Sequence, residues 1–244
     1  MPDQVATCGA PHNSTLDSMN DTLRALDESG YAIAPAVMGP TQLASIEEAL
    51  ASVPLAGAGT RNLLEFPWCR TLVDLLRQCT QVAAALPRKP VAVQCTLFDK
   101  SEEKNWLVAL HQDLNIPVRE RIDHPRLGIW SKKEGQQFVQ APAELLEQLL
   151  AVRVHIDECG LTNGPLRVVP GSHRHGRMSE TEARQLRDVV GEVTCEIGVG
   201  GALLFRPLLL HASSKAVAPR RRRVLHFLFG PEAIGYGLRW QHAV

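Results

Sequence analysis

The hydrophobic pattern of the chain changes after Pro90, and this change constrains the fold more than any other feature of the sequence. Downstream, short apolar segments alternate with Gly, Pro, Asn and Asp, which is typical of β-strands joined by turns. Seven such segments span residues 91–98, 105–111, 150–156, 165–169, 192–197, 201–205 and 223–229. Helical spacing interrupts them only at about 179–190. Short strands in this number predict a mainly β fold, either a sandwich or a closed roll.

The first part of the chain has a different character. Residues 1–20 are rich in Pro, Gly, Ser, Thr and Asn and predict a loose leader. Helices are expected at about 20–29, 41–52 and 67–86, where apolar residues recur at steps of three and four. We therefore expect one domain over residues 21–244, with a helical layer (about 21–90) covering one face of the β region (about 91–244). The segment at about 119–140 is long for a connection and is predicted to be a lid or binding loop.

Charge and cysteine content narrow the classes of partner. Lys+Arg and Asp+Glu both number 26, so no net field attracts nucleic acid or an anionic membrane, and a small-molecule partner is expected. The six cysteines are scattered without a CxxC pair, which predicts reduced, structural thiols. No apolar run approaches the length of a membrane span, and the N-terminus lacks the pattern of a signal peptide, so a cytoplasmic location is expected. The sequence carries no signal for an oligomeric state.

Two His-x-Asp motifs are candidates for a metal site. Two histidines and one carboxylate on one face of a metal leave positions open for an oxidant, as in non-haem Fe(II) oxygenases. On a strand, residues two apart point to the same side, so either His111-Gln112-Asp113 or His155-Ile156-Asp157 satisfies this pattern. His211, at the end of a later apolar segment, is the natural third ligand. More strand-like segments separate it from Asp113 than from Asp157, which favours the first motif and leaves His155 as a pocket-lining or structural histidine.

An arginine near the end of the chain suggests a carboxylate-binding group. Arginine binds a carboxylate through a planar fork that lysine lacks. Arg222 lies 11 residues beyond His211, at the start of an apolar segment. It belongs to a run of four arginines (220–223), and on its own that run is better explained as a solvated charge run or a nuclear-targeting patch.

Taken together, these motifs resemble the phytanoyl-CoA dioxygenase family of Fe(II)/2-oxoglutarate oxygenases. The resemblance runs from about residue 91 to 240 and rests on NWLVALHQDLNI, VHIDECGLTNGPLRVVPGSHRHG, RPLLLHASS and RRRRVLHFLF. It implies a double-stranded β-helix (a cupin-like jelly roll), iron held by His111, Asp113 and His211, and 2-oxoglutarate held by Ser213 and Arg222. Fe(II), 2-oxoglutarate and O2 are then the cofactors and cosubstrates. The second His-x-Asp is not a ligand pair in the family.

The expected activity is a dioxygenase that hydroxylates an unactivated C–H bond of a small molecule. Desaturation or epimerisation at the same iron site, and a non-catalytic jelly-roll binding module, are the alternatives. A zinc hydrolase has less support, since there is no HExxH motif. Gln94 is a candidate cosubstrate contact, and Trp130 and His155 are candidate substrate contacts.

Three further residues are expected to be structural. His173 and His175 belong to a turn, and Trp240 is expected to pack against the roll.

Overall fold

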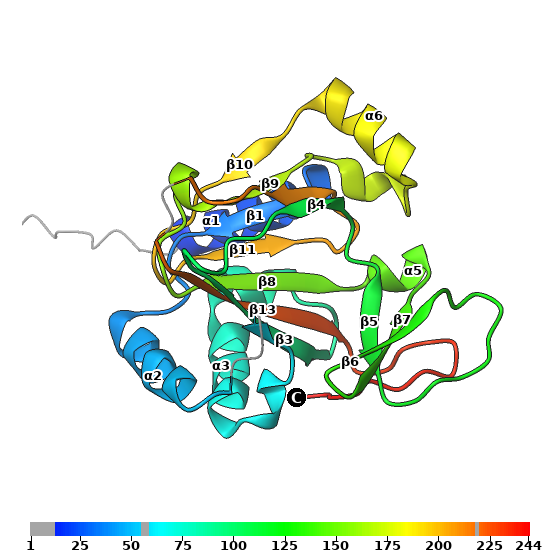
Figure 1. Cartoon of the computed structure of the whole chain (residues 1–244), viewed down its shortest axis with the longest axis horizontal. Coiled ribbons are helices and arrows are strands. Elements are labelled where there is room, and N and C mark those ends of the chain that lie inside the picture. Colours follow the sequence, from blue (N-terminus) through cyan, green and yellow to red (C-terminus); the bar gives the residue numbers. More distant parts are fainter. Residues whose placement is uncertain (1–12, 55–58, 218–219) are drawn as a thin grey trace, which may run out of the picture.

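Two antiparallel sheets form a roll in the computed structural model, which describes residues 13–54, 59–217 and 220–244. The larger sheet has the strand order β1-β11-β8-β13-β3-β2, and the smaller has the order β10-β9-β12-β4. A third sheet, β5-β7-β6, lies at one end of the roll (Figure 1). All of these ladders are antiparallel, and in the two larger sheets most neighbouring strands come from distant parts of the chain. This topology is the predicted double-stranded β-helix.

The strands are mostly short, and two of them are long. The long strands are β3 (Pro90–Lys100) and β13 (Arg222–Pro231), which pair along their whole length. The short strands are β1 (Tyr31–Ala34), β2 (Gly59–Thr60), β4 (Val108–His111), β5 (Asn115–Val118), β6 (Trp130–Lys133), β7 (Gln136–Gln140), β8 (Leu150–His155), β9 (Leu166–Val168), β10 (Val193–Cys195), β11 (Ala202–Phe205) and β12 (His211–Ser213).

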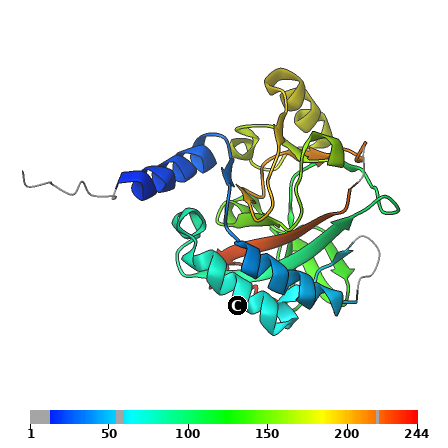
Figure 2. The same ribbon diagram turned by 90° about the vertical axis from the view of Figure 1, so that its left-hand side faces the viewer.

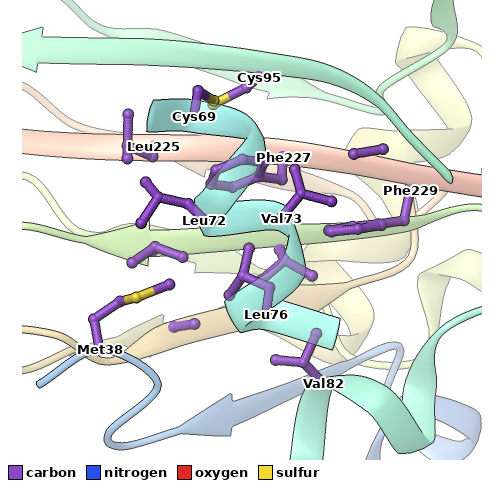
Figure 3. Packing of buried hydrophobic residues seen from close by; sticks show 14 of the residues in the cluster. Met38, Cys69, Leu72, Val73, Leu76, Val82, Cys95, Leu225, Phe227 and Phe229 are labelled. Atoms are coloured by element: carbon purple, nitrogen blue, oxygen red, sulfur yellow. The ribbon is translucent and has the colours of Figure 1, made fainter. Parts of the chain in front are cut away.

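Helices cover the outer face of the large sheet, as the sequence predicted (Figures 1 and 2). They are α1 (Asn13–Glu28), α2 (Pro40–Ala51), α3 (Pro67–Gln78) and α4 (Thr80–Ala85). Two further helices lie elsewhere: α5 (Ala143–Leu146) precedes β8, and α6 (Glu180–Val190) packs beside Leu110 of β4 in the smaller sheet. Leu72 and Leu76 of α3 pack against Leu225, Phe227 and Phe229 of β13 (Figure 3). Burying this apolar surface, at roughly 25 cal/mol per Å², fixes which face of β13 points outward.

Alternation along β13 then fixes which side chains point into the roll. Since neighbours on a strand face opposite ways, Arg222, Val224 and His226 face inward when Leu225 and Phe227 face the helices. The same alternation on β8 places Arg153 and His155 inside, opposite Val152 and Val154 in the helix-facing core. The helical layer therefore determines the contents of the roll.

Two predictions about the N-terminal part need correction. The first helix begins at Asn13, within the segment that was expected to be loose, and residues 1–12 lie outside the described part. The helix expected over 67–86 is two helices, because Cys79 adopts extended angles (φ −69°, ψ 120°) between α3 and α4. Apolar spacing continues across this break, since Leu76 and Val82 join the same core, so periodicity could not reveal it. Strands β1 and β2 also lie inside the region assigned to helices.

The segment at 119–140 is not wholly a loop. Its second half is a hairpin of β6 and β7, joined at Glu134 and Gly135, both with positive φ. Two consecutive positive φ angles are typical of a type I′ hairpin turn. Glycine is favoured at the second position of such a turn, which Gly135 occupies here. Within this segment only residues 119–129 lie outside the hairpin, so any lid is limited to this shorter stretch.

Three other predictions are confirmed. Trp240 is buried, and its indole N–H donates to the carbonyl of Pro231 at 2.8 Å. His173 and His175 lie in a 3₁₀ turn (Ser172–His175). The five cysteines among the described residues are free, and Cys8 lies outside them. No helix in the described ranges is long and apolar enough to cross a membrane.

Candidate functional site

His111, Asp113 and His211 meet inside the roll. His111 ends β4 and His211 begins β12, and the two residues face each other as partners in the antiparallel ladder. Asp113 follows two residues after His111, and its carboxylate lies 3.6 Å from Nε2 of His111 and 3.8 Å from Nε2 of His211. The three potential ligand atoms all lie within 4.8 Å of one another. Such a spacing suits a single metal ion placed between them.

Backbone contacts orient both imidazoles toward this point. Nδ1 of His111 lies 2.8 Å from the carbonyl of Ala109, and Nδ1 of His211 lies 2.9 Å from that of Leu209. A carbonyl only accepts, so each Nδ1 carries the proton and each Nε2 offers a lone pair. The backbone N–H of Asp113 donates to the carbonyl of Pro207 at 2.8 Å, which anchors the carboxylate in the same way. Contacts of this kind fix the orientation of metal ligands.

The charges of the cluster suit a divalent cation. Burial raises the pKa of Asp113, but the neighbouring His211, His111 and His226 outweigh it and hold this pKa well below its usual range. Burial lowers the pKa of His211 to about 4, so this imidazole is neutral at physiological pH. Burial lowers the pKa of His111, but its contact with Asp113 outweighs burial and raises this pKa, so His111 must release a proton when a cation binds. One carboxylate and two imidazole nitrogens are the donor set of a non-haem Fe(II) site, and the residues present fit that metal.

The second His-x-Asp motif does not form a comparable cluster. His155 is buried and its Nδ1 has no hydrogen-bond partner among the described residues. Asp157 lies beyond the end of β8, where its carboxylate accepts hydrogen bonds from Arg223. Because β8 ends at His155, the alternation that would bring both side chains to one side no longer applies. The first motif is therefore the one that the fold brings to His211.

Arg222 and Ser213 converge on one carbonyl oxygen in the same cavity. Nη1 of Arg222 and Oγ of Ser213 both donate to the carbonyl of Gly164. Gly164 has φ +71°, and a Cβ there would lie 2.6 Å from the carbonyl of Ser214, so only glycine fits this turn. Arg222 is 3% exposed, and its Nε has no partner among the described residues. A carboxylate would satisfy this donor, so the pair fits the distal carboxylate of 2-oxoglutarate.

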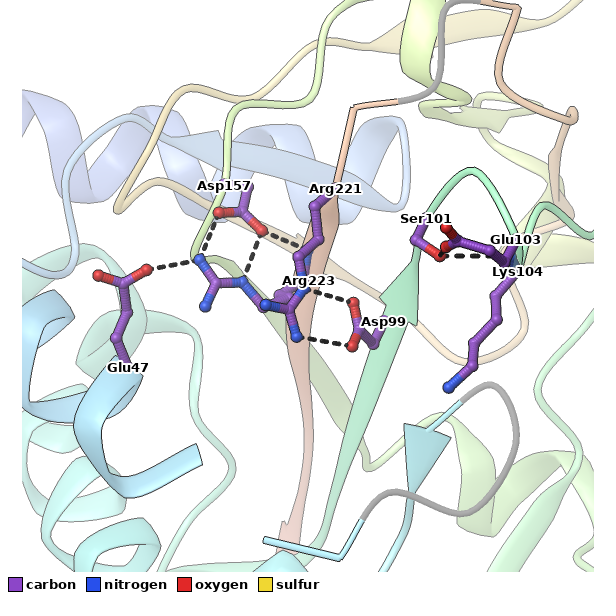
Figure 4. Close-up of polar contacts among 8 residues, drawn as sticks. All are labelled: Glu47, Asp99, Ser101, Glu103, Lys104, Asp157, Arg221 and Arg223. Atoms are coloured by element: carbon purple, nitrogen blue, oxygen red, sulfur yellow. Dashed lines mark hydrogen bonds and ion pairs between the residues drawn. The ribbon is translucent and has the colours of Figure 1, made fainter. Parts of the chain in front are cut away.

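The neighbouring arginines face the other way. Arg223 binds Asp157 and Glu47 through its guanidinium, and Arg221 binds Asp99 at 3.0 Å (Figure 4). Arg222 and Arg223 therefore point to opposite sides, as neighbours on a strand do. However, Arg223 is not a freely solvated charge, because its side chain is only 12% exposed and part of an ion-pair network.

A cavity of about 310 Å³ contains the site. His111, Asp113, His211, Ser213 and Arg222 all line it, as does Gln94, whose amide donates to Thr96 at 2.7 Å.

The two substrate candidates lie elsewhere in the described part. Trp130 packs against a separate core cluster with Arg121 over its ring, and His155 is buried inside the roll without lining the cavity. Neither lines the cavity.

Sequence reasoning missed three residues that line the cavity. Arg153, His226 and Phe98 all lie on inward-facing positions of the large sheet. The signal was present in the segments VRVH and VLHF, where a polar residue interrupts an otherwise apolar strand. His226 lies closest to the ligands, with Nε2 4.0 Å from the carboxylate of Asp113.

Solved structures share the fold. The non-haem α-ketoglutarate-dependent epimerase SnoN from nogalamycin biosynthesis has a TM-score of 0.65 at 16% identity, over 88% of this chain and 83% of that chain. HygX from Streptomyces hygroscopicus, with nickel and 2-oxoglutarate bound, has a TM-score of 0.61 at 16% identity, over 90% and 93%. EctD from S. alaskensis, in its apoform, has a TM-score of 0.61 at 18% identity, over 93% and 80%. At these identities the likeness establishes the fold.

Sequence comparison identifies the family. A search of curated proteins found no match. The model of the phytanoyl-CoA dioxygenase (PhyH) family matches residues 26–224, which include both His-x-Asp motifs, His211 and Arg222. This match begins well before residue 91, where the sequence motifs begin, and includes most of the helical layer. The chain therefore belongs to the phytanoyl-CoA dioxygenase family.

Proposed function

We propose that this protein is an Fe(II)- and 2-oxoglutarate-dependent dioxygenase that oxidises a small organic molecule. One observation carries the proposal: a two-histidine, one-carboxylate cluster shares its cavity with a buried arginine whose Nε lacks a partner among the described residues. A metal hydrolase has no use for such an arginine, whereas 2-oxoglutarate needs both groups. The solved neighbours that use the same cosubstrate support the proposal.

Each residue has a distinct role in this proposal. Nε2 of His111, a carboxylate oxygen of Asp113 and Nε2 of His211 hold the iron. Arg222 and Ser213 bind the distal carboxylate of 2-oxoglutarate, and Gln94 lies in the same cavity as a further polar contact. The protons on Nδ1 of both histidines stay in their hydrogen bonds to backbone carbonyls, so the ligands keep one tautomer.

The remaining cavity wall controls access of water. Apolar side chains of Leu114, Ile116, Phe138 and Leu228 line it beside the polar groups. They exclude water from the metal and strengthen the electrostatic contacts within the cavity.

The chemistry that Fe(II) would supply when bound is the reduction of O2, coupled to the oxidative decarboxylation of 2-oxoglutarate. With hydroxylation, substrate, 2-oxoglutarate and O2 give hydroxylated substrate, succinate and CO2, so one oxygen atom enters each organic product. We favour hydroxylation of an unactivated C–H bond. Epimerisation and desaturation use the same ligands, and SnoN, which has this fold, is an epimerase. A cytoplasmic location remains a prediction from the sequence.

An anaerobic titration tests the proposal directly. Purified protein is loaded with Fe(II), and 2-oxoglutarate is added while the visible spectrum is recorded. We expect the weak charge-transfer band that a chelating 2-oxo acid gives on ferrous iron, and slow succinate formation once O2 is admitted. The Asp113→Ala variant is the control and is expected to give no band. Absence of the band from the native protein at saturating iron and 2-oxoglutarate contradicts the proposed function.

A further inference from the structure

Arg153 is a buried cation that forms no ion pair within the described part of the chain. Its side chain points into the roll from the middle of β8 and lines the cavity, and the residue is 8% exposed. No hydrogen bond or ion pair joins its guanidinium to the described residues, although the ring of Phe98 lies 5.0 Å away and supports it from one side. A buried charge without a partner is costly to the fold and is typical of a binding site.

The other arginines that line the cavity are already engaged. Arg61 binds Glu134 at 2.7 Å, and Arg222 donates to the carbonyl of Gly164. Burial and the nearby Arg222 lower the pKa of Arg153 to about 10, so Arg153 still carries its charge at physiological pH. It is the cavity arginine for which the proposed iron and cosubstrate sites give no role.

Arg153 and Arg222 belong to different levels of the roll. In the ladder between β13 and β8, Arg153 is the partner of His226, whose imidazole lies beside Asp113. Arg222 lies four residues further along β13, where its ladder partner is Lys100 on β3. With Arg222 bound to the distal carboxylate of 2-oxoglutarate, Arg153 lies at the level of the metal, where the molecule to be oxidised must approach.

Charge balance in the cavity supports a second anion. Asp113 is the only acidic residue among those that line the cavity. Glu134 neutralises Arg61, and the other cations of the cavity, Arg153, Arg222, Lys133 and Fe(II), carry five positive charges. Asp113 and doubly ionised 2-oxoglutarate supply three negative charges, so positive charge remains in the cavity after the cosubstrate has bound.

We propose that the molecule oxidised in this cavity carries a carboxylate, and that Arg153 binds it. This inference rests on the proposed function and specifies its substrate class as a small organic acid. The planar guanidinium of Arg153 matches a carboxylate bidentately, and Phe98 fixes its orientation before binding. The cavity volume of about 310 Å³ is at the lower end of the roughly 300–1,000 Å³ of ligand pockets, which favours a compact acid.

The test measures carboxylate binding to protein that is already saturated with Fe(II) and 2-oxoglutarate, under anaerobic conditions. Propionate and benzoate are the probes, and propionamide and benzamide are their neutral counterparts. Binding is followed by the shift of the visible band and by the rise in Tm. Wild type is compared with Arg153→Gln and Arg153→Lys, and Arg220→Gln, which removes an exposed arginine, controls for general salt effects.

We expect at least one of the two acids to bind wild type more tightly than its amide. Arg153→Gln should weaken this binding by roughly tenfold or more, with partial recovery in Arg153→Lys, while the Kd for 2-oxoglutarate changes by less than about threefold. Equal responses of wild type and Arg153→Gln overturn the inference, and so does binding of neither acid. A tenfold loss of 2-oxoglutarate affinity in Arg153→Gln also overturns it, because Arg153 then belongs to the cosubstrate site. A native protein without the visible band points instead to failure of the proposed function.

Discussion

Replacing Arg222 by alanine removes one partner of a pair that is buried when the cosubstrate is bound. Arg222 is 3% exposed, and its Nε has no partner among the described residues until a ligand arrives. Without the guanidinium, the distal carboxylate of 2-oxoglutarate must lose its hydration and receives in return only the hydroxyl of Ser213.

The expected magnitude follows from this burial. Truncating one member of a buried, hydrogen-bonded charge pair costs about 2–5 kcal/mol. Since each 1.4 kcal/mol is tenfold in Kd, the Kd for 2-oxoglutarate should rise roughly 30-fold or more. Lysine at this position should recover only part of the loss, because an ammonium cannot form two parallel hydrogen bonds with the carboxylate.

Two neighbouring arginines provide controls of different kinds. Arg220→Ala removes an exposed charge and should change neither stability nor affinity appreciably. Arg223→Ala breaks the contacts to Asp157 and Glu47, so it should lower Tm while leaving the Kd for 2-oxoglutarate within about threefold. This variant separates a loss of stability from a loss of binding.

The assay is the anaerobic titration of each Fe(II)-loaded variant with 2-oxoglutarate, followed through the visible band. A Kd for Arg222→Ala within threefold of wild type refutes the assignment of Arg222. Equal losses in Arg222→Ala and Arg223→Ala refute the argument from strand alternation.

Three further predictions concern the metal, a buried lysine and the proposed lid. Asp113→Ala should lose Fe(II) binding, whereas Asp157→Ala should keep it and lower Tm; metal retention on a desalting column checks both, and the reverse pattern contradicts the ligand assignment. Burial, Arg222 and Arg153 lower the pKa of Lys100 to about 8, well below the value of about 10.4 in an unfolded chain. Between these pH values the unfolded chain keeps a proton that the folded one has released, so this lysine makes the free energy of unfolding rise with pH from about 8 to 10. Denaturant titrations should show a flatter profile in Lys100→Met, and identical slopes count against the assignment. Hydrogen exchange should change on substrate binding in 119–129 but not in the paired hairpin at 130–140, and unchanged protection in 119–129 excludes a lid there.

Sequence reasoning predicted the parts of the fold that depend on alternation and spacing. The inward position of Arg222 follows from the apolar positions Leu225 and Phe227, which a one-residue slip of β13 would turn away from the helices. The sequence allowed us to predict that His111 and His211 lie together, because each ends an apolar segment and each matches a ligand position of the family motif. In each case the order of apolar and polar residues along one strand shows which side chains are buried.

Other parts depended on contacts that no local pattern carries. The break at Cys79 is invisible to periodicity because both helices bury the same side. The strand β1 is too short to show alternation and is defined only by its pairing with β11. Arg153 looks like a routine charged residue in the sequence, and its lack of a partner becomes evident only when the residues around it are placed.

The ladder position shared by His111 and His211 ties metal loading to completion of the fold. The two ligands belong to adjacent strands that are far apart along the chain, and they are neighbours only after β12 has docked against β4. A partly folded chain therefore offers the metal one His-x-Asp arm and no second imidazole. Iron bound across this seam holds the two strands together and stabilises the closed roll by mass action, more strongly as the metal concentration rises above its Kd. In the proposed site, metal binding with all three ligands therefore requires that β12 has already paired with β4.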